Sequence, residues 1–169
     1  MKSEFKEISI RGRVAWCILC LENAIKFYGL EDLNWDFIFS LLWSYTNGKV
    51  GNWHYPMAEA MPASILTTPY SKRDMENLTE SQYDELKKLY SSGNEVTNFI
   101  IDKVFEVGTR DLYSSIVNDS PDTIKYTEEI KEVMEKNKIP LPDISLFKKI
   151  PISENEGWGR EFTREDLFK

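Results

Sequence analysis

The side chains that most often carry enzymatic chemistry are scarce in this sequence. Its 169 residues include one histidine, His54, and two cysteines, Cys17 and Cys20. A histidine base needs an orienting carboxylate and a nucleophile, and although Glu59 lies five residues on, no G-x-S-x-G motif supplies the nucleophile. P-loop, G-x-G-x-x-G and H-E-x-x-H patterns are also missing from the sequence. We therefore predict no catalytic residue and no cofactor, and we expect that the protein is not an enzyme.

The two cysteines form a C-x-x-C pattern inside an apolar run. Redox pairs of this kind activate the first thiolate at an exposed helix N-terminus, whereas Cys17 and Cys20 lie among Trp16 and Leu19. A structural zinc site needs four ligands, and His54 is the only histidine. We predict that both thiols are buried as small apolar side chains and that the chain has no metal site.

Carboxylates recur at helical spacing in the second half of the chain. Glu95, Asp102 and Glu106 fall on the polar side of one predicted helix. A solvated helix face is the simplest interpretation, and an acidic surface for a cationic partner is the alternative. Neither D-x-D nor EF-hand spacing is present, which disfavours a divalent-metal site. A second acidic group follows on the next predicted helix: Glu128, Glu129, Glu132 and Glu135.

Two aromatic segments are further candidates for binding. Trp53 and Tyr55 flank His54, and aromatic residues are enriched at interface hot spots, although a structural histidine among aromatics is the simpler interpretation. Trp158 stands between two glycines, so it either plugs a groove on the helical body or is displayed to a partner. We favour the plug, with Arg160 paired to a helix carboxylate. The candidate partner-binding residues are thus Asp102, Glu106, Glu95, Trp53, His54, Trp158 and Arg160.

The elements that position these residues are predicted to be helices with marked ends. An almost continuously apolar run over 14–28, ended by Gly29, predicts a central buried helix. Thr79 and Gln82 match a capping box, and a second box is expected over 92–95. Phe5–Ile10 is the only strand candidate, and one short strand makes no sheet. The other predicted helices cover residues 35–45, 79–90 and 121–134. One or two short helices are expected within 58–66. A helix over 93–107 is expected to break at Gly108 and to resume over 111–117.

The fold class predicted from these elements is all-α. Residues 1–169 are expected to form a single domain, an orthogonal or irregular bundle of about six to seven helices. After Lys138 the prolines at 140, 142 and 151 predict an extended C-terminal arm, 139–169, that lies across the helices.

The charge and hydropathy of the chain limit its partners and its location. The formal net charge is −7, which argues against nucleic acid and is compatible with a basic protein partner. No apolar run is long enough to span a membrane, and the first residues lack the apolar region of a signal peptide. With two cysteines that cannot form a disulfide framework, a cytoplasmic location is the simplest expectation.

Four segments resemble small all-helical bacterial immunity proteins of polymorphic or contact-dependent toxin systems. They are Gly12–Trp16, Cys20–Ala24, Leu42–Tyr45 and Asn155–Gly159. The resemblance implies a helical protein that neutralises a cognate toxin by binding it directly, and many such toxins are nucleases with basic clefts. Two alternatives stay open: an adaptor or structural module with an unknown partner, and a small carboxylate-based enzyme that uses His54 or Arg13.

Overall fold

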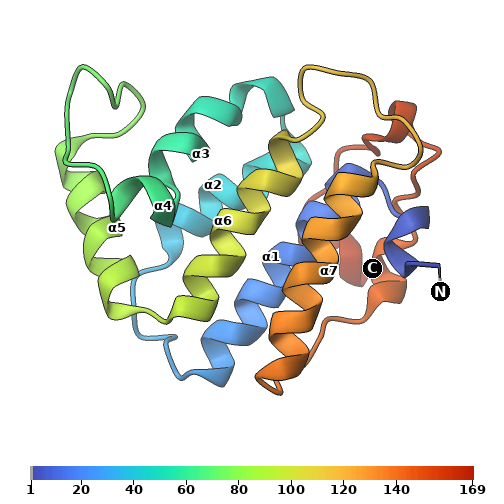
Figure 1. Cartoon of the computed structure of the whole chain (residues 1–169), viewed down its shortest axis with the longest axis horizontal. Coiled ribbons are helices and arrows are strands. Elements are labelled where there is room, and N and C mark those ends of the chain that lie inside the picture. The colour runs from blue at the N-terminus through green and yellow to red at the C-terminus, as the bar shows by residue number, and fades with distance from the viewer. Residues whose placement is uncertain (1) are drawn as a thin grey trace.

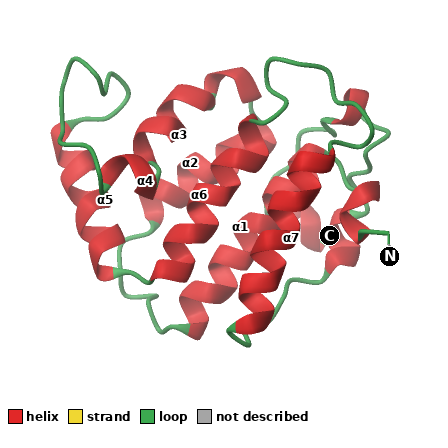
Figure 2. Cartoon of the chain, in the orientation of Figure 1, coloured by secondary structure: helices red, strands yellow, loops and turns green. Residues whose placement is uncertain are grey.

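The central element of the fold is α1 (Ile10–Phe27), which packs against α2, α6 and α7 (Figure 1). The computed structural model describes residues 2–169, so Met1, the first residue of the predicted domain, lies outside the described part. All regular structure there is helical, as the sequence predicted (Figure 2). Besides α1, the α-helices are α2 (Asp36–Asn47), α3 (His54–Ala60), α4 (Pro62–Ile65), α5 (Glu80–Ser92), α6 (Glu95–Thr109) and α7 (Pro121–Lys136).

Helix α1 begins earlier than its apolar pattern indicates. The hydroxyl of Ser9 caps the helix by accepting a hydrogen bond from the Gly12 backbone N–H at 3.1 Å, which makes Ile10 the first helical residue. Arg11 and Arg13 lie inside this extra turn and are both buried. Almost every side of α1 is covered, which confirms its prediction as the buried centre.

The two buried arginines bind backbone carbonyl groups of distant segments. Arg11 donates to the carbonyl of Gly48, after α2, and to that of Gly159 in the arm, both at 3.0 Å. Arg13 donates to the carbonyls of Phe5 at 3.1 Å and Ser120 at 3.2 Å. Four chain segments are therefore fixed to one end of α1.

The segment predicted as a strand is not one. Glu4–Glu7 forms the 3₁₀ helix η1, and Ile8 makes one isolated antiparallel bridge with Pro151. A strand needs a continuous partner, and the arm offers only this single bridging residue.

Helix ends follow the predicted capping boxes in one case and depart from them in the other. Thr79 and Gln82 form the expected box at the start of α5. The box of α6 pairs Asn94 with Thr97, and the predicted pairing of Ser92 with Glu95 is wrong. The break expected at Gly108 is also wrong, because α6 continues to Thr109, and 111–117 contains no helix.

The C-terminal arm, 139–169, packs on the helices, and short 3₁₀ turns interrupt its extended course. These turns are η3 (Ile144–Phe147), η4 (Asn155–Gly157) and η5 (Glu165–Phe168). Phe147 and Phe162 are buried in the same hydrophobic core as the helices. Arg164 adds a two-pronged ion pair with Glu22 of α1, each contact 2.9 Å long.

No helix within residues 2–169 is long and apolar enough to cross a membrane.

Candidate binding surface

The single histidine lies in a partly exposed cluster of aromatic side chains. His54, the first residue of α3, shares a hydrogen bond of 2.8 Å between its Nδ1 and the hydroxyl of Tyr113. Its ring stacks on Tyr55 with 4.9 Å between centroids and an angle of 14°, and Phe105 of α6 lies 5.8 Å away. Tyr55 is 67% exposed and Tyr113 74% exposed. We call His54, Tyr55, Phe105 and Tyr113 the aromatic face.

The aromatic face rests on buried rings. Trp53 is only 2% exposed and stacks against Phe105, with 6.3 Å between ring centroids. Its indole N–H donates to the Leu41 carbonyl at 2.9 Å, and Tyr45 meets it edge-on at 4.9 Å. The prediction that Trp53 contacts a partner is wrong, because α2 and α6 enclose it. It supports the exposed rings from below.

Gly108 allows α6 to lie close to these buried rings. A Cβ atom at this position would be 2.8 Å from Trp53 and 3.0 Å from Tyr45. The hydroxyl of Tyr45 donates to the Gly108 carbonyl at 2.8 Å. The glycine therefore marks a close helix–ring approach and not a helix break.

Tyr113 belongs to the loop 110–120, which a strained turn holds in place. Asn118, Asp119 and Ser120 all have left-handed backbone angles, with φ of 52°, 61° and 52°. Such angles cost free energy for residues other than glycine and persist where surrounding contacts impose them. Here the contacts are the Arg13 bond to the Ser120 carbonyl and a bond from the Ser120 hydroxyl to Asp111.

The three carboxylates predicted on α6 lie at two different places along it. Asp102 accepts a hydrogen bond from the Ala63 backbone N–H at the start of α4, at 3.0 Å. Burial raises the pKa of Asp102, and the Ala63 bond partly opposes that rise. Glu106, one turn on and next to Phe105, is 2.7 Å from the ammonium group of Lys103. Glu95 is exposed at the far end of α6, about 10 Å from Asp102 along the helix axis.

A groove of about 530 Å³ runs beside Tyr55, between α3 and the loop before α5. Tyr55 and Glu59 line it from the helix, and three charged side chains line it from the loop: Arg73, Asp74 and Glu76. The groove therefore joins an exposed aromatic ring to an acidic wall.

The other two predicted residues lie in the arm, outside the aromatic face. Trp158 is half-buried against the core, and its carbonyl accepts from the Arg11 backbone N–H at 3.1 Å, which agrees with the plug interpretation. Arg160 pairs with Glu154 of the arm at 2.5 Å. The predicted pairing of Arg160 with a helix carboxylate is thus wrong, since a nearer acid lies in its own turn.

The cysteines are where the sequence placed them. Both thiols are fully buried in α1 and free, and burial raises the pKa of each well above its usual value. A thiol with such a raised pKa is neutral at physiological pH, so neither is an activated nucleophile. Within residues 2–169, no group of three histidine, cysteine or carboxylate side chains is arranged to hold a metal ion.

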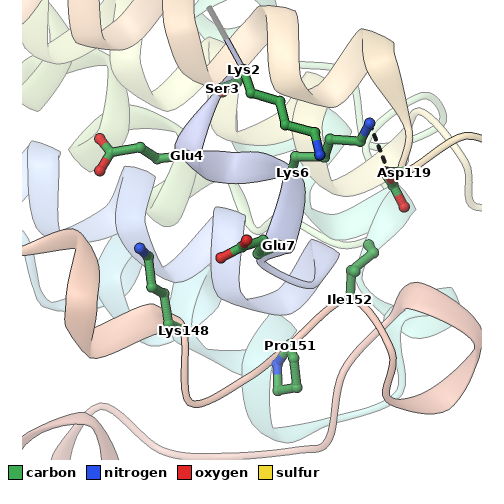
Figure 3. Close-up of a pocket in the computed structure, with 9 residues that line it drawn as sticks. All are labelled: Lys2, Ser3, Glu4, Lys6, Glu7, Asp119, Lys148, Pro151 and Ile152. Carbon is green, nitrogen blue, oxygen red and sulfur yellow. Dashed lines mark ion pairs between the residues drawn. The ribbon is translucent and has the colours of Figure 1, made fainter.

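A second pocket, of about 520 Å³, lies between η1 and the arm (Figure 3). Its charges balance, and Lys6 is already 3.7 Å from Asp119. An equal number of surface lysines and acids favours no particular ligand. The charged residues that line it are Lys2, Lys6, Lys148, Glu4, Glu7 and Asp119.

The sequence did not point to Phe105 or Tyr113 as surface residues. Phe105 lies between polar and apolar positions of α6, and Tyr113 is an isolated aromatic in a polar loop. The only local signal for either residue was a large aromatic side chain directly followed by a polar residue.

Comparisons with family models, with curated proteins and with solved structures found no match for this chain. Its function is therefore inferred from its own residues.

Proposed function

We propose that this protein binds another protein through the aromatic face and that the partner is a basic bacterial toxin domain, which it neutralises. The observation that carries the proposal is the exposure of two large aromatic side chains, Tyr55 and Tyr113, on one braced cluster. Tyrosine is enriched at the energetic centres of protein interfaces, and clustered exposed aromatics on a soluble surface mark interaction sites.

The rigidity of the aromatic face supports a binding role. His54 holds Tyr113 by a hydrogen bond and Tyr55 by stacking, while Trp53 fixes Phe105 from below. Side chains ordered before association lose less conformational freedom on binding, so more of the contact energy appears as affinity.

The charge of the chain supports a basic partner. The net charge is −7, and Asp102 and Glu106 lie on the same helix as Phe105. A negative field attracts a cationic surface and disfavours an acidic one. The resemblance to immunity proteins suggests what that surface is: the basic cleft of a toxin.

Co-expression with the product of the adjacent gene tests the proposed function. We expect this chain to restore growth of cells that produce the adjacent gene's product and to form a 1:1 complex with it. Two monodisperse proteins that do not associate would contradict the proposal. Binding without growth rescue would support the adaptor interpretation.

A further inference from the structure

We propose that the groove beside Tyr55 receives an arginine side chain of the protein partner, which stacks on the tyrosine ring and pairs with the carboxylates that line the groove. This inference rests on the proposed function in one respect, that the ligand belongs to a protein. It adds which part of the partner is recognised and where.

The ring of Tyr55 is positioned to stack with a planar cation. His54 lies nearly parallel to it, with 4.9 Å between centroids, and so holds the ring in one orientation. At 67% exposure, Tyr55 leaves much of its surface open to a ligand in the groove that it lines. A cation over a tyrosine face is attracted by the negative charge of the ring's π-system.

Carboxylates on both sides of the groove, Glu59 on α3 and Asp74 and Glu76 on the loop, supply the complementary charge. The Oε2 atom of Glu59 accepts a hydrogen bond from the backbone N–H of Asn77 at 2.9 Å. This bond fixes the carboxylate and leaves its other oxygen available. Among residues 2–169, neither Glu59 nor Glu76 forms an ion pair with a basic side chain. At the groove, the described residues form one ion pair, between Arg73 and Asp74 at 3.3 Å.

Arg73 does not neutralise these carboxylates by itself. Its side chain is 90% exposed, and its guanidinium group contacts only the carboxylate of the next residue. Three acids therefore face one solvated base, so the groove keeps a net negative charge. An arriving cation can compete with Arg73 for Asp74 and pair with Glu59 and Glu76.

An arginine suits this arrangement better than a lysine does. Its guanidinium group is flat, so one face can stack on Tyr55 while its edges donate two hydrogen bonds to a carboxylate. A lysine ammonium group is compact and strongly hydrated, and it cannot do both at once. The groove therefore distinguishes two side chains of equal charge.

A titration of the full chain with short peptides tests this inference without the toxin. The probe is acetyl-Gly-Arg-Gly-amide, and the same peptide with lysine or glutamate in the middle provides the comparison. NMR should show saturable shifts confined to Tyr55, His54 and Glu59 with the arginine peptide, weaker binding of the lysine peptide, and none of the glutamate peptide. About 1 M salt should abolish the shifts, since the Debye length is then about 3 Å.

Two variants and one control locate the binding. Tyr55→Ala should weaken binding of the arginine peptide about threefold, and the double variant Tyr55→Ala with Glu59→Gln should weaken it about tenfold. These values follow from the usual size of exposed cation–π and ion-pair contacts. Both positions are on the surface, and glutamine keeps an acceptor for the Asn77 N–H. Phe27→Ala removes an exposed aromatic ring at the end of α1 and should change nothing.

Different experimental results would contradict this inference and the proposed function. Equal affinity for the arginine and lysine peptides, or shifts scattered over all acidic surfaces, would overturn the inference even if the toxin were neutralised. If the arginine peptide binds in the groove while the toxin does not associate, the arginine site stands and the proposed function is contradicted.

Discussion

Gly108 lies where α6 passes over two buried aromatic rings, and the lack of a side chain there keeps Trp53 beneath the aromatic face. Two opposing effects meet at this residue. Alanine is favoured over glycine inside a helix by about 1 kcal/mol. A methyl group 2.8 Å from Trp53 cannot be accommodated without moving the ring, and overpacking of this kind costs about 1–3 kcal/mol.

We predict that Gly108→Ala lowers the free energy of unfolding by about 1–2 kcal/mol, because the steric cost exceeds the gain in helix propensity. Chemical denaturation of the two proteins measures this difference. Gly51→Ala is the matched control, since no heavy atom lies within 4 Å of the place that its added methyl group would occupy, and it should be nearly neutral. Equal stability of Gly108→Ala and the natural sequence would show that the rings yield easily.

Asp102 gives a prediction about pH. Its pKa in the folded protein is raised, first by burial, so the native state holds the proton more tightly than the unfolded chain. A raised carboxyl pKa means that ionisation costs stability above the folded pKa, and that this cost disappears below the unfolded pKa.

We therefore expect Asp102→Asn, which keeps an acceptor for the Ala63 N–H, to be the more stable protein at pH 7. The advantage should shrink as the pH falls through the carboxyl range and vanish once Asp102 is protonated in both states. Unfolding curves from pH 3 to pH 7, about the carboxyl titration range, provide the comparison. A variant less stable than the natural sequence at neutral pH would contradict the burial argument.

The elements converge on the first turn of α1, and Arg13 is the residue that binds most of them. It donates to Phe5 of η1 at 3.1 Å, to the carbonyl of Ser120 at 3.2 Å and to the hydroxyl of Thr123 in α7 at 2.7 Å. Burial lowers its pKa to about 10, so it is still charged at neutral pH. It joins the start of the chain, the strained turn and α7 in one place.

Arg13→Met should lower the free energy of unfolding by about 2–4 kcal/mol, because two buried carbonyls and a hydroxyl lose a charged donor. Replacing a buried ion pair by apolar groups can be neutral, but here the polar acceptors stay buried, and the Phe5 and Ser120 carbonyls keep only neutral donors such as the backbone N–H groups of Ile8 and Ile124. Arg160→Met, which breaks one surface pair with Glu154, serves as the control and should cost less than about 1 kcal/mol. Urea denaturation measures the free energy of unfolding of both variants. Similar losses of stability in the two would contradict the role of Arg13.

The sequence was a good guide to elements whose signals are local. The Thr79 box and the apolar run that contains Cys17 and Cys20 define their helices without reference to the rest of the chain. Trp53 was misjudged, and the burial of Arg13 was not predicted, for the opposite reason. A charged residue before an apolar run is typical of a surface, and a tryptophan beside His54 suggests exposure, but acceptors and covering helices from far along the chain bury both.

At the scale of the whole molecule, the C-terminal arm is part of the core. Phe162 and Leu167 are buried, and the Phe162 backbone N–H donates to the Thr46 carbonyl of α2 at 3.0 Å. Gly159 has a φ of +83° and lies so close to Ser9 that any side chain would collide with it. The arm therefore closes the end of the bundle at which α1 begins.

Deletion of residues 153–169 should cost about 3–6 kcal/mol, from the burial of Phe162 and Leu167 alone. Thermal unfolding followed by circular dichroism should show a large fall in the melting temperature. Phe168→Ala removes an arm side chain that is 56% exposed and should leave the melting temperature almost unchanged. A truncated protein as stable as the full chain would mean that the arm is an appendage.

The aromatic face is also a property of the whole molecule, since α3, α6 and the loop 110–120 each supply part of it. No one segment contains the pattern, so the sequence could indicate His54 but not the aromatic surface to which it belongs. Their assembly depends on Trp53 below and on the turn held by Arg13.

The most direct test of the central claim is calorimetric titration of the adjacent gene's product with three forms of this chain. They are the natural sequence, the double variant Tyr55→Ala and Tyr113→Ala, and the control Phe27→Ala. We predict 1:1 binding by the natural sequence and the control, and binding about 100-fold weaker for the double variant, as expected for the loss of two central tyrosines. Equal affinity of all three forms would contradict the claim that the aromatic face is the binding surface.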